Sequence, residues 1–205
     1  NMTPGNGFTY SILDLTHSGT GDQAGAAFAP QALALDFNQA FSFHFNWYIP
    51  VPGGDKTLRG DGMTFVLTGM PALGTGGTGL GYDGSASNSV AWAIDTFSFE
   101  DEPVSPSLQI LAGGSYTSPA ATETGLGDAV RDPDFQWFGT LTYTPSGNDD
   151  NTGTLVAGME HINLGSFSTQ VDVDFGALGL AGVPVYYGFT ASNGAAIDGH
   201  STSWC

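Results

Sequence analysis

Apolar residues stand at every second position in several short segments of the chain, which is the spacing of a β-strand with one face against a core. The clearest segment is residues 41–50, FSFHFNWYIP, in which Phe41, Phe43, Phe45 and Trp47 alternate with polar residues. Similar alternation, or a short apolar run between turn residues, predicts strands within residues 8–19, 23–38, 60–69, 88–97, 108–114, 135–145, 153–165, 170–178, 183–192 and 201–205. Most of the chain is therefore expected to consist of strands joined by turns.

The composition agrees with an all-β fold. Glycine accounts for 31 of the 205 residues, aromatic residues for 12% and charged residues for only 11%. This mixture favours strands and tight turns, because helix formers such as Lys and Glu are scarce. The composition shows no break along the chain, so we expect one domain over residues 1–205, built as an antiparallel two-sheet β-sandwich.

The charge balance excludes some classes of partner. Twenty acidic residues against three Lys and Arg give a formal net charge of −17, which repels phosphate backbones and anionic lipid surfaces. We therefore expect no nucleic-acid partner, and no apolar run is long enough for membrane insertion. The single cysteine, Cys205, allows no internal disulfide. The chain starts at Asn1 without Met, so we expect a domain excised from a longer protein.

Residues 60–110 hold the features around which the chain is organised. Two strands with a buried pattern, 60–69 and 88–97, each carry an aspartate near one end, Asp61 and Asp95. Between them lies the glycine-rich sequence PALGTGGTGLGYDG, which suits tight turns or a loop that presents its backbone to a ligand. After Asp95 the chain runs TFSFEDEP, with three consecutive acids. We expect these loops to gather at one end of a sheet, an arrangement suited to binding on a rigid scaffold.

The motifs GDGMTFVL, GGTGLGY, SVAWAIDTF and EPVSPSLQI, in this order and spacing, resemble the core signature of the L-type (legume-lectin-like) family, and most of all its bacterial surface adhesin members. The resemblance extends to YYGFTASNGAAIDGHSTSW near the C-terminus and to FSFHFNWYIP before the core, and so covers most of the chain. It implies a concanavalin-like jelly-roll sandwich and a carbohydrate-binding function without enzymatic activity. It also implies an extracellular, secreted or cell-surface adhesin whose partners are glycans.

The resemblance further implies a shallow sugar site where four loops meet. In the family, an aspartate of the first loop, a backbone N–H of the glycine-rich loop, an asparagine and an aromatic beside the calcium loop, and backbone of the last loop converge on the sugar. Phe99 stands at the asparagine position and is expected either to give a stacking face or only to fill the gap. Matched by position, the predicted sugar-binding residues are Asp61, Gly77, Thr78, Gly79, Phe99, Gly194, Ala195, Ala196 and Asp198.

The acidic loop of the family binds calcium and often a transition metal, and this chain matches that set only in part. Asp95 is present, but the family's glutamate is replaced by Ala93 and its histidine by Ser107, so the resemblance implies no transition metal. A solvated acidic turn without metal is one alternative. The other is a Ca²⁺ site, which takes roughly six to eight oxygens. Its candidate ligands are Asp95, the Phe97 carbonyl, Glu100, Asp101 and Glu102.

Two other classes of function compete with sugar binding. A retaining sandwich glycosidase needs two carboxylates, commonly on a Glu-x-Asp-x-x-Glu strand. Here both glutamate positions are lost, at Ala93 and Ser98, so we expect no enzyme. A structural or protein-interaction sandwich that kept the fold and lost the sugar site is the alternative that the sequence leaves open.

Some residues are assigned to the scaffold rather than to the site. Lys56 and Arg59 are expected to be solvated loop charges, and Asp128 an ordinary surface acid. His44 is expected to face solvent, and His200 to make a structural hydrogen bond. The core is expected to hold Trp47, Trp92, Trp137 and Trp204.

Overall fold

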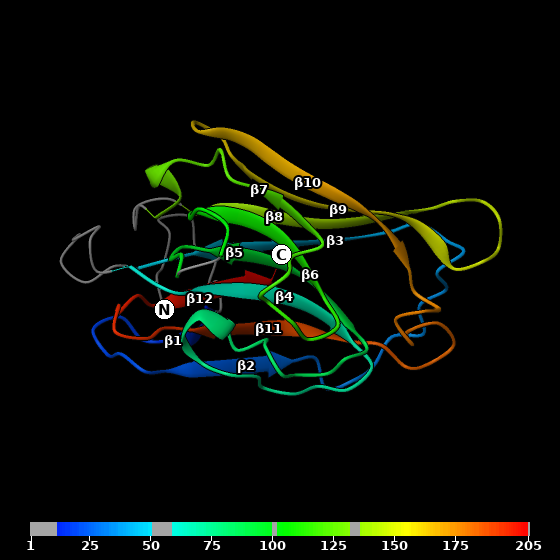
Figure 1. Ribbon diagram of the computed structural model, residues 1–205, viewed down its shortest axis with the longest axis horizontal. Coiled ribbons are helices and arrows are strands. Elements are labelled where there is room, and N and C mark those ends of the chain that lie inside the picture. The colour runs from blue at the N-terminus through cyan, green and yellow to red at the C-terminus, as the bar shows by residue number, and fades with distance from the viewer. Residues whose placement is uncertain (1–11, 51–58, 100–101, 132–135, 205) are drawn as a thin grey trace, which may run out of the picture.

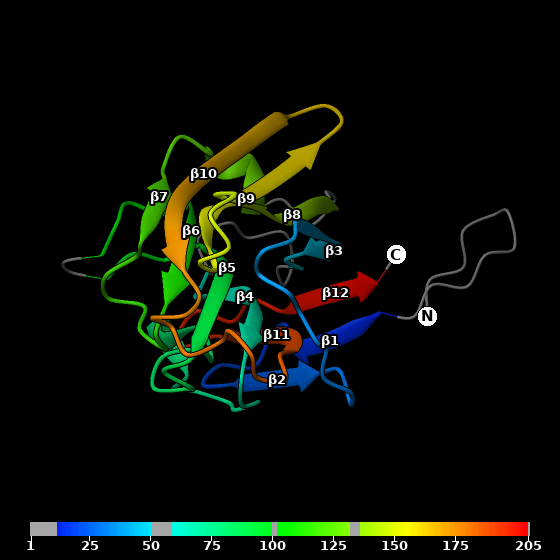
Figure 2. The same ribbon diagram turned by 90° about the vertical axis from the view of Figure 1, so that its right-hand side faces the viewer.

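A computed structural model describes residues 12–50, 59–99, 102–131 and 136–204. These residues form two antiparallel six-stranded sheets, which confirms the expected sandwich, and Figure 2 shows the sheets as facing layers. The first sheet has the strand order β1 (Leu13–Thr16), β12 (His200–Trp204), β3 (Phe41–Tyr48), β8 (Trp137–Pro145), β9 (Thr152–His161) and β10 (Gly165–Asp174). The second has the order β2 (Ala24–Phe28), β11 (Tyr186–Ser192), β4 (Gly62–Thr68), β5 (Ser89–Asp95), β6 (Ser107–Ala112) and β7 (Ala121–Glu123). Short 3₁₀ helices are η2 (Gly77–Gly79) and η3 (Asp128–Arg131).

Aromatic side chains fill the space between the sheets, as the alternation predicted. The Phe45 ring of β3 stacks on Phe65 of β4 with centroids 4.8 Å apart and meets Trp92 of β5 edge-on at 5.1 Å. Trp92 is fully buried, and its Nε1 donates to the Gly158 carbonyl of β9 at 2.9 Å. It therefore joins the two sheets by a hydrogen bond as well as by packing. The core contains Trp47, Trp92 and Trp137 as expected, whereas the Trp204 side chain lies outside the described residues.

Strands β4 and β5 depart from the one-sided pattern that their alternation predicted. Every residue of both strands is buried. Val66, Ala91 and Ala93 turn away from the main core and pack against Leu80 and Tyr82 of the glycine-rich segment. That segment is therefore a cover over the outer face of the sheet, where the sequence predicted only a turn or a ligand-binding loop. Burial on both faces explains why the small and apolar residues of these strands are nearly continuous.

Three further details differ from the sequence-based expectations. Strand β10 begins at Gly165, earlier than the expected residue 170. Strand β7 lies in a polar stretch for which no strand was predicted. It is the edge strand of its sheet and pairs with β6 through only three residues. Within residues 23–38 the strand is β2, whereas the alternating residues 33–37 contribute only an isolated bridge from Leu33 to Val185.

The last two strands lie in different sheets, so the loop 193–199 crosses from one sheet to the other. This crossing loop and η2 lie toward the left in Figure 1, and the β8–β9 turn lies at the opposite end. Within the described parts of the chain, no helix is long and apolar enough to cross a membrane.

Candidate functional site

Asp61 lies immediately before β4, where several loops meet. Its N–H donates to the Ser192 carbonyl at the end of β11 (3.0 Å), and its carbonyl accepts from the N–H (2.8 Å) and the hydroxyl (3.0 Å) of Thr96, which follows β5. The peptide bond between Gly60 and Asp61 is cis. These bonds hold Asp61 between the two strands that pair with β4. Asp61 and the turn after β5 therefore lie side by side.

Two glycines approach the Asp61 carboxylate. A Cβ atom at Gly77 would lie 3.8 Å from Asp61 Oδ2, and one at Gly194 would lie 3.2 Å from the same oxygen. Gly77 has φ +60°, a conformation that favours glycine. The Ser192 hydroxyl donates to the Gly77 carbonyl, which ties the glycine-rich loop to the end of β11. The glycine-rich loop and the last loop thus both reach Asp61 with backbone atoms, without a side chain in between.

The acidic loop places the Phe97 side chain next to this group and exposes a second ring, that of Phe99. A Cβ atom at Gly60 would lie 3.2 Å from Phe97 Cβ and 2.9 Å from Ala196 Cβ, so Phe97 and the last loop flank the GDG turn. Phe97 is 42% exposed and Phe99 is 55% exposed. The Phe99 N–H donates to Glu102 Oε2 at 2.7 Å, and the Phe99 carbonyl accepts from the Glu102 N–H at 3.1 Å. The sequence analysis gave Phe97 only a backbone role and missed its exposed ring.

Asp198, one of the predicted sugar contacts, is buried. Its side chain is 0% exposed, and its Oδ2 accepts the Gly60 N–H at 3.0 Å. Asp198 therefore supports the GDG turn from beneath, and its contact with a sugar stays a prediction. Gly79, the last residue of η2 and also a predicted sugar contact, is buried as well. The predicted residues of the two glycine-containing loops that reach the surface at least in part are Gly77, Thr78, Gly194, Ala195 and Ala196.

Burial makes the carboxyl groups of the site hard to ionise. Asp61 is 4% exposed, and its Oδ2 has no hydrogen-bond partner in the described part of the chain. Burial together with the charge of Glu102 raises its pKa to about 6. Burial raises the pKa of Asp95 to about 7, although the N–H of Phe97 opposes the shift. Burial likewise raises the pKa of Asp198 to about 7. Carboxyl groups that keep their protons to an unusually high pH are therefore gathered beneath the surface at this end of the sandwich.

The prediction for Arg59 is wrong, whereas Asp128 is exposed at the surface as expected. Arg59 is only 7% exposed, and its Nη1 donates to Asp128 Oδ1 at 3.0 Å. Arg131 of η3, which the sequence analysis did not consider, donates to the same oxygen at 2.8 Å. Arg59 thus holds the pKa of the exposed Asp128 carboxyl below its usual range. These cations are buried beside the site instead of being solvated, while Lys56 lies outside the described residues.

The described members of the predicted calcium set do not fit a metal ion. Asp95 Oδ1 accepts the Phe97 N–H at 3.0 Å, and Asp95 Oδ2 accepts Gln109 Nε2–H at 3.1 Å. Glu102 is engaged with the N–H of Phe99. Among the residues that the structure describes, no three Asp, Glu, His or Cys side chains are grouped to hold a metal. The remaining two candidate ligands, Glu100 and Asp101, lie outside the described residues, and the expectation about a transition metal stays untested.

His200 is fully buried at the start of β12. Its Nδ1 lies 2.8 Å from the Thr16 hydroxyl, which confirms the expected structural hydrogen bond, and burial lowers its pKa to about 3. His44 is exposed on β3, also as expected, and its Nε2 lies 3.0 Å from the Ser42 hydroxyl.

We expect the protein to melt at a higher temperature near about pH 5.5 than near about pH 7.5. The raised pKa values of Asp61, Asp95 and Asp198 mean that these groups hold protons more tightly in the folded state. Their stabilisation is present at low pH and is lost as the pH rises through about 6 to 7. His200 opposes them, because its pKa is lowered from 6.5 to about 3 and its contribution is lost as the pH falls below 6.5.

Melting temperatures measured across this pH range test the expectation. The combined contribution of the three carboxyl groups to the pH dependence of stability should exceed the opposite contribution of the one imidazole. Asp198→Asn should make the melting temperature depend less on pH, while it keeps an oxygen that can accept the Gly60 N–H. A wild-type melting temperature that climbs steadily between about pH 5.5 and 7.5 would contradict it.

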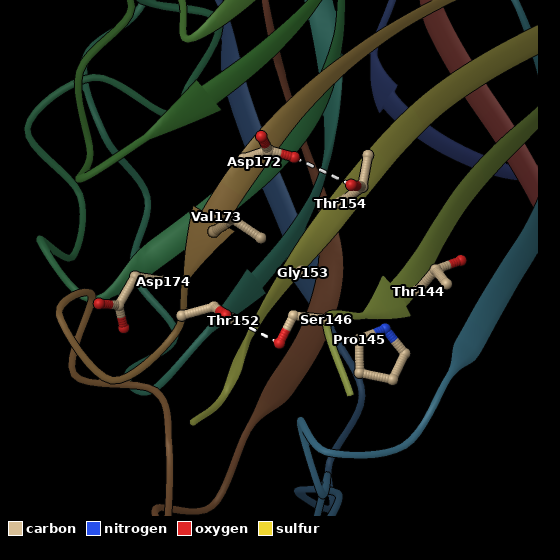
Figure 3. A pocket seen from close by; sticks show the side chains of 9 residues that line it. All are labelled: Thr144, Pro145, Ser146, Thr152, Gly153, Thr154, Asp172, Val173 and Asp174. Atoms are coloured by element: carbon tan, nitrogen blue, oxygen red, sulfur yellow. Dashed lines mark hydrogen bonds between the residues drawn. The ribbon is translucent and has the colours of Figure 1, made fainter. Parts of the chain in front are cut away.

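A second hollow, of about 470 Å³, lies far from this site, between the β8–β9 turn and β10. Figure 3 shows that its polar side chains are largely engaged with one another. Thr154 Oγ1 donates to Asp172 Oδ1 at 2.9 Å, and Thr152 Oγ1 lies 3.1 Å from Ser146 Oγ. Asp174 Oδ1 accepts the Ala177 N–H at 2.8 Å and so closes the turn after β10. The size of this hollow alone does not make it a ligand site.

No protein-family model matches the chain, and no curated protein matches it in sequence. Solved structures do match. Basic winged bean lectin with Tn-antigen is 21% identical, with 94% of this chain and 84% of that chain covered and a TM-score of 0.73. Lectin I-B4 from Griffonia simplicifolia in its metal-free form is 17% identical, with 94% and 85% covered and a TM-score of 0.75. The VIP36 exoplasmic/lumenal domain in its Ca²⁺/Man-bound form is 18% identical, with 96% and 78% covered and a TM-score of 0.64. The chain therefore has the β-sandwich fold of legume lectins and of VIP36.

Proposed function

We propose that this protein is a carbohydrate-binding module whose site is the shallow meeting point of the GDG turn, the glycine-rich loop, the acidic loop and the last loop. The observation that carries the proposal is the Asp61 carboxylate. Among the residues that the structure describes, its Oδ2 has no hydrogen-bond partner, and it lies beside Gly77 and Gly194, which carry no side chain. A buried acceptor without a partner costs stability, and such a cost is typical of a group kept for a ligand.

A saccharide supplies what this arrangement lacks. Its hydroxyl groups can donate to Asp61 Oδ2, which is a charge-assisted hydrogen bond when the carboxyl is ionised. Its flatter apolar face can pack on the exposed rings of Phe97 and Phe99. Because Gly77 and Gly194 have no side chains, the sugar ring can come close to backbone N–H groups of both loops.

The structural neighbours support the same reading. Basic winged bean lectin is bound to Tn-antigen, and the VIP36 domain is in a Ca²⁺/Man-bound form. We propose glycans as the partners and an extracellular setting, in which residues 1–205 act as one adhesin-type domain of a secreted or cell-surface protein. A binding role without catalysis agrees with the loss of both glutamates of the glycosidase strand, at Ala93 and Ser98.

The proposal is tested by a glycan array with wild-type protein, followed by titration of the best ligand into a Phe99→Ala variant. We expect Phe99→Ala to weaken binding by about three- to tenfold, because it removes a stacking face worth about 0.5–1.5 kcal/mol. Phe99 is 55% exposed, so the fold should tolerate the change.

Val104→Ala is the matched control, because Val104 lies in the same loop and is 72% exposed. Its affinity should equal that of the wild type. An array without any bound glycan would favour the structural or protein-interaction sandwich instead. Equal losses in both variants would show that general loop damage, not stacking, explains the effect.

A further inference from the structure

The amide of Gln109 bridges the residues at which the resembling family holds a transition metal. In the β5–β6 register, Asp95 lies opposite Ser107 and Ala93 lies opposite Gln109. Gln109 is 2% exposed, and its Nε2 donates to Asp95 Oδ2 at 3.1 Å and to Ser107 Oγ at 2.8 Å. The small Ala93 side chain leaves space on this face of the sheet for the longer Gln109 side chain. The bond to Asp95 joins β6 to β5, and the bond to Ser107 fixes the amide against its own strand.

The guanidinium of Arg131 ties the two ends of the acidic loop together. Its Nη2 donates to the Thr96 carbonyl, where the loop leaves β5, and to Ser105 Oγ at 3.0 Å, shortly before β6 begins. Its Nη1 donates to Asp128 Oδ1 at 2.8 Å, which anchors the side chain to η3. Arg131 is only 9% exposed, and its bond to the buried Thr96 carbonyl is shielded from water, whereas its partner Asp128 is exposed.

Thr96 connects this contact to the candidate sugar site. Its N–H and its hydroxyl both donate to the Asp61 carbonyl, at 2.8 and 3.0 Å. Thr96 therefore carries both the carbonyl that Arg131 contacts and the two donors that hold Asp61. A displacement of the acidic loop would move Asp61 as well as Phe97 and Phe99.

We propose that Gln109 and Arg131 are positioning residues that hold the acidic loop with protein N–H donors, and that saccharide binding by this protein therefore requires no metal ion. The inference rests on the proposed function. Both Asp95 oxygens already accept N–H groups, and the Arg131 guanidinium lies at the Thr96 carbonyl. A cation bound nearby would have to displace the amide and would be repelled by Arg131.

Wild-type protein provides the first test. Melting temperature and glycan affinity are measured with excess chelator and with millimolar Ca²⁺ or Mn²⁺. We expect the melting temperature to stay within about 1 °C and the affinity within about twofold. A metal that binds the folded state would raise the melting temperature, because at a free metal concentration c it stabilises the fold by RT ln(1 + c/Kd). A clear rise with Ca²⁺, or affinity lost in chelator, would overturn the proposal.

Variants provide the second test. Arg131→Gln is expected to speed hydrogen exchange of the amides of residues 96–105 and to weaken glycan binding by about tenfold, because it removes a charge-assisted tie. Asp128→Asn is the matched control, because it removes the ion pair with Arg131 but leaves the bonds of Nη2. It should keep exchange and affinity near wild-type values. Equal behaviour of the two variants would overturn the role of Arg131.

Gln109→Glu keeps the size of the side chain but replaces two donors with a charge beside Asp95. We expect faster exchange of the loop in chelator and a melting temperature that now responds to divalent cations. Wild-type exchange in this variant would overturn the role of the amide. If Arg131→Gln does not fold, Arg131→Lys is used, since its single ammonium cannot reproduce the three guanidinium contacts.

The exchange and melting measurements need no sugar. If wild-type protein binds no glycan with or without metal, the proposed function fails, while the positioning role is still decided by exchange in Arg131→Gln and Gln109→Glu.

Discussion

Replacing Asp61 with asparagine is expected to weaken saccharide binding strongly and, at the same time, to raise the melting temperature at about pH 7.5. Loss of a charged acceptor should weaken binding by about 1.5–3 kcal/mol, or roughly 10- to 150-fold. The stability gain follows from the pKa of Asp61, which burial raises to about 6. At about pH 7.5 the carboxylate is ionised against its preference, so a neutral amide relieves on the order of 1–3 kcal/mol.

Titration calorimetry with an array-derived glycan and thermal melting of the same sample measure both effects. A gain of this size corresponds to a shift of a few degrees, at about 2–4 °C per kcal/mol for a chain of this length. Asp172→Asn is the matched control, because Asp172 is an exposed acid in the hollow of Figure 3. It should change neither quantity. Undiminished affinity in Asp61→Asn would remove Asp61 from the site.

Trp92→Ala is expected to cause the largest loss of stability. The side chain is fully buried between the sheets, contacts Phe45 edge-on and donates to the Gly158 carbonyl. Its removal leaves a large cavity and should cost about 3–5 kcal/mol, a large fraction of a typical stability of about 5–15 kcal/mol. Urea unfolding followed by circular dichroism measures the change.

Trp92→Phe separates packing from hydrogen bonding at the same position. It retains a ring but removes the N–H that donates to the Gly158 carbonyl, and the loss of this hydrogen bond should cost about 0.5–1.5 kcal/mol. Because Trp92 belongs to the core, folded Trp92→Phe should bind glycans with wild-type affinity. A wild-type urea midpoint in Trp92→Ala, or lost affinity in folded Trp92→Phe, would show that this tryptophan has a different role.

Much of the scaffold could be predicted from the sequence, because alternation reports directly which side chains face a core. Phe45 and Trp47 on β3 show this clearly. The pattern was less informative for β4 and β5. Alternation cannot show that a glycine-rich segment folds back over the second face of a sheet, where Leu80 and Tyr82 bury Val66. That contact depends on tertiary structure.

The sequence could predict which loops form the site, because their order along the chain and the strands they follow determine where they lie. The proximity of Asp61, Gly77 and Gly194 follows from the pairing of β4 with β11 and from the glycine-rich loop that precedes β5. The burial of Asp198 and of Arg59 was not predictable, because a charge in a loop is usually solvated. The signal that could have found the arginines is their rarity, since the chain has only three basic residues.

The prediction of a metal site depended on residues whose neighbours in space could not be known from the sequence. Asp95 matches a family ligand, but its environment is set by Gln109 on the neighbouring strand. Two positions that read Ala93 and Ser107 in place of Glu and His indicated the loss of metal ligands. They did not indicate that an amide from β6 fills the resulting space.

The most direct test of the central claim is an amide NMR titration of the wild-type protein with an array-derived glycan. We expect chemical-shift changes confined to Gly77–Thr78, Phe97–Phe99 and Gly194–Ala196, with Asp61 among the most shifted residues. Shifts clustered at Thr152–Thr154 and Asp172–Asp174, around the hollow of Figure 3, with none at Asp61, would contradict it.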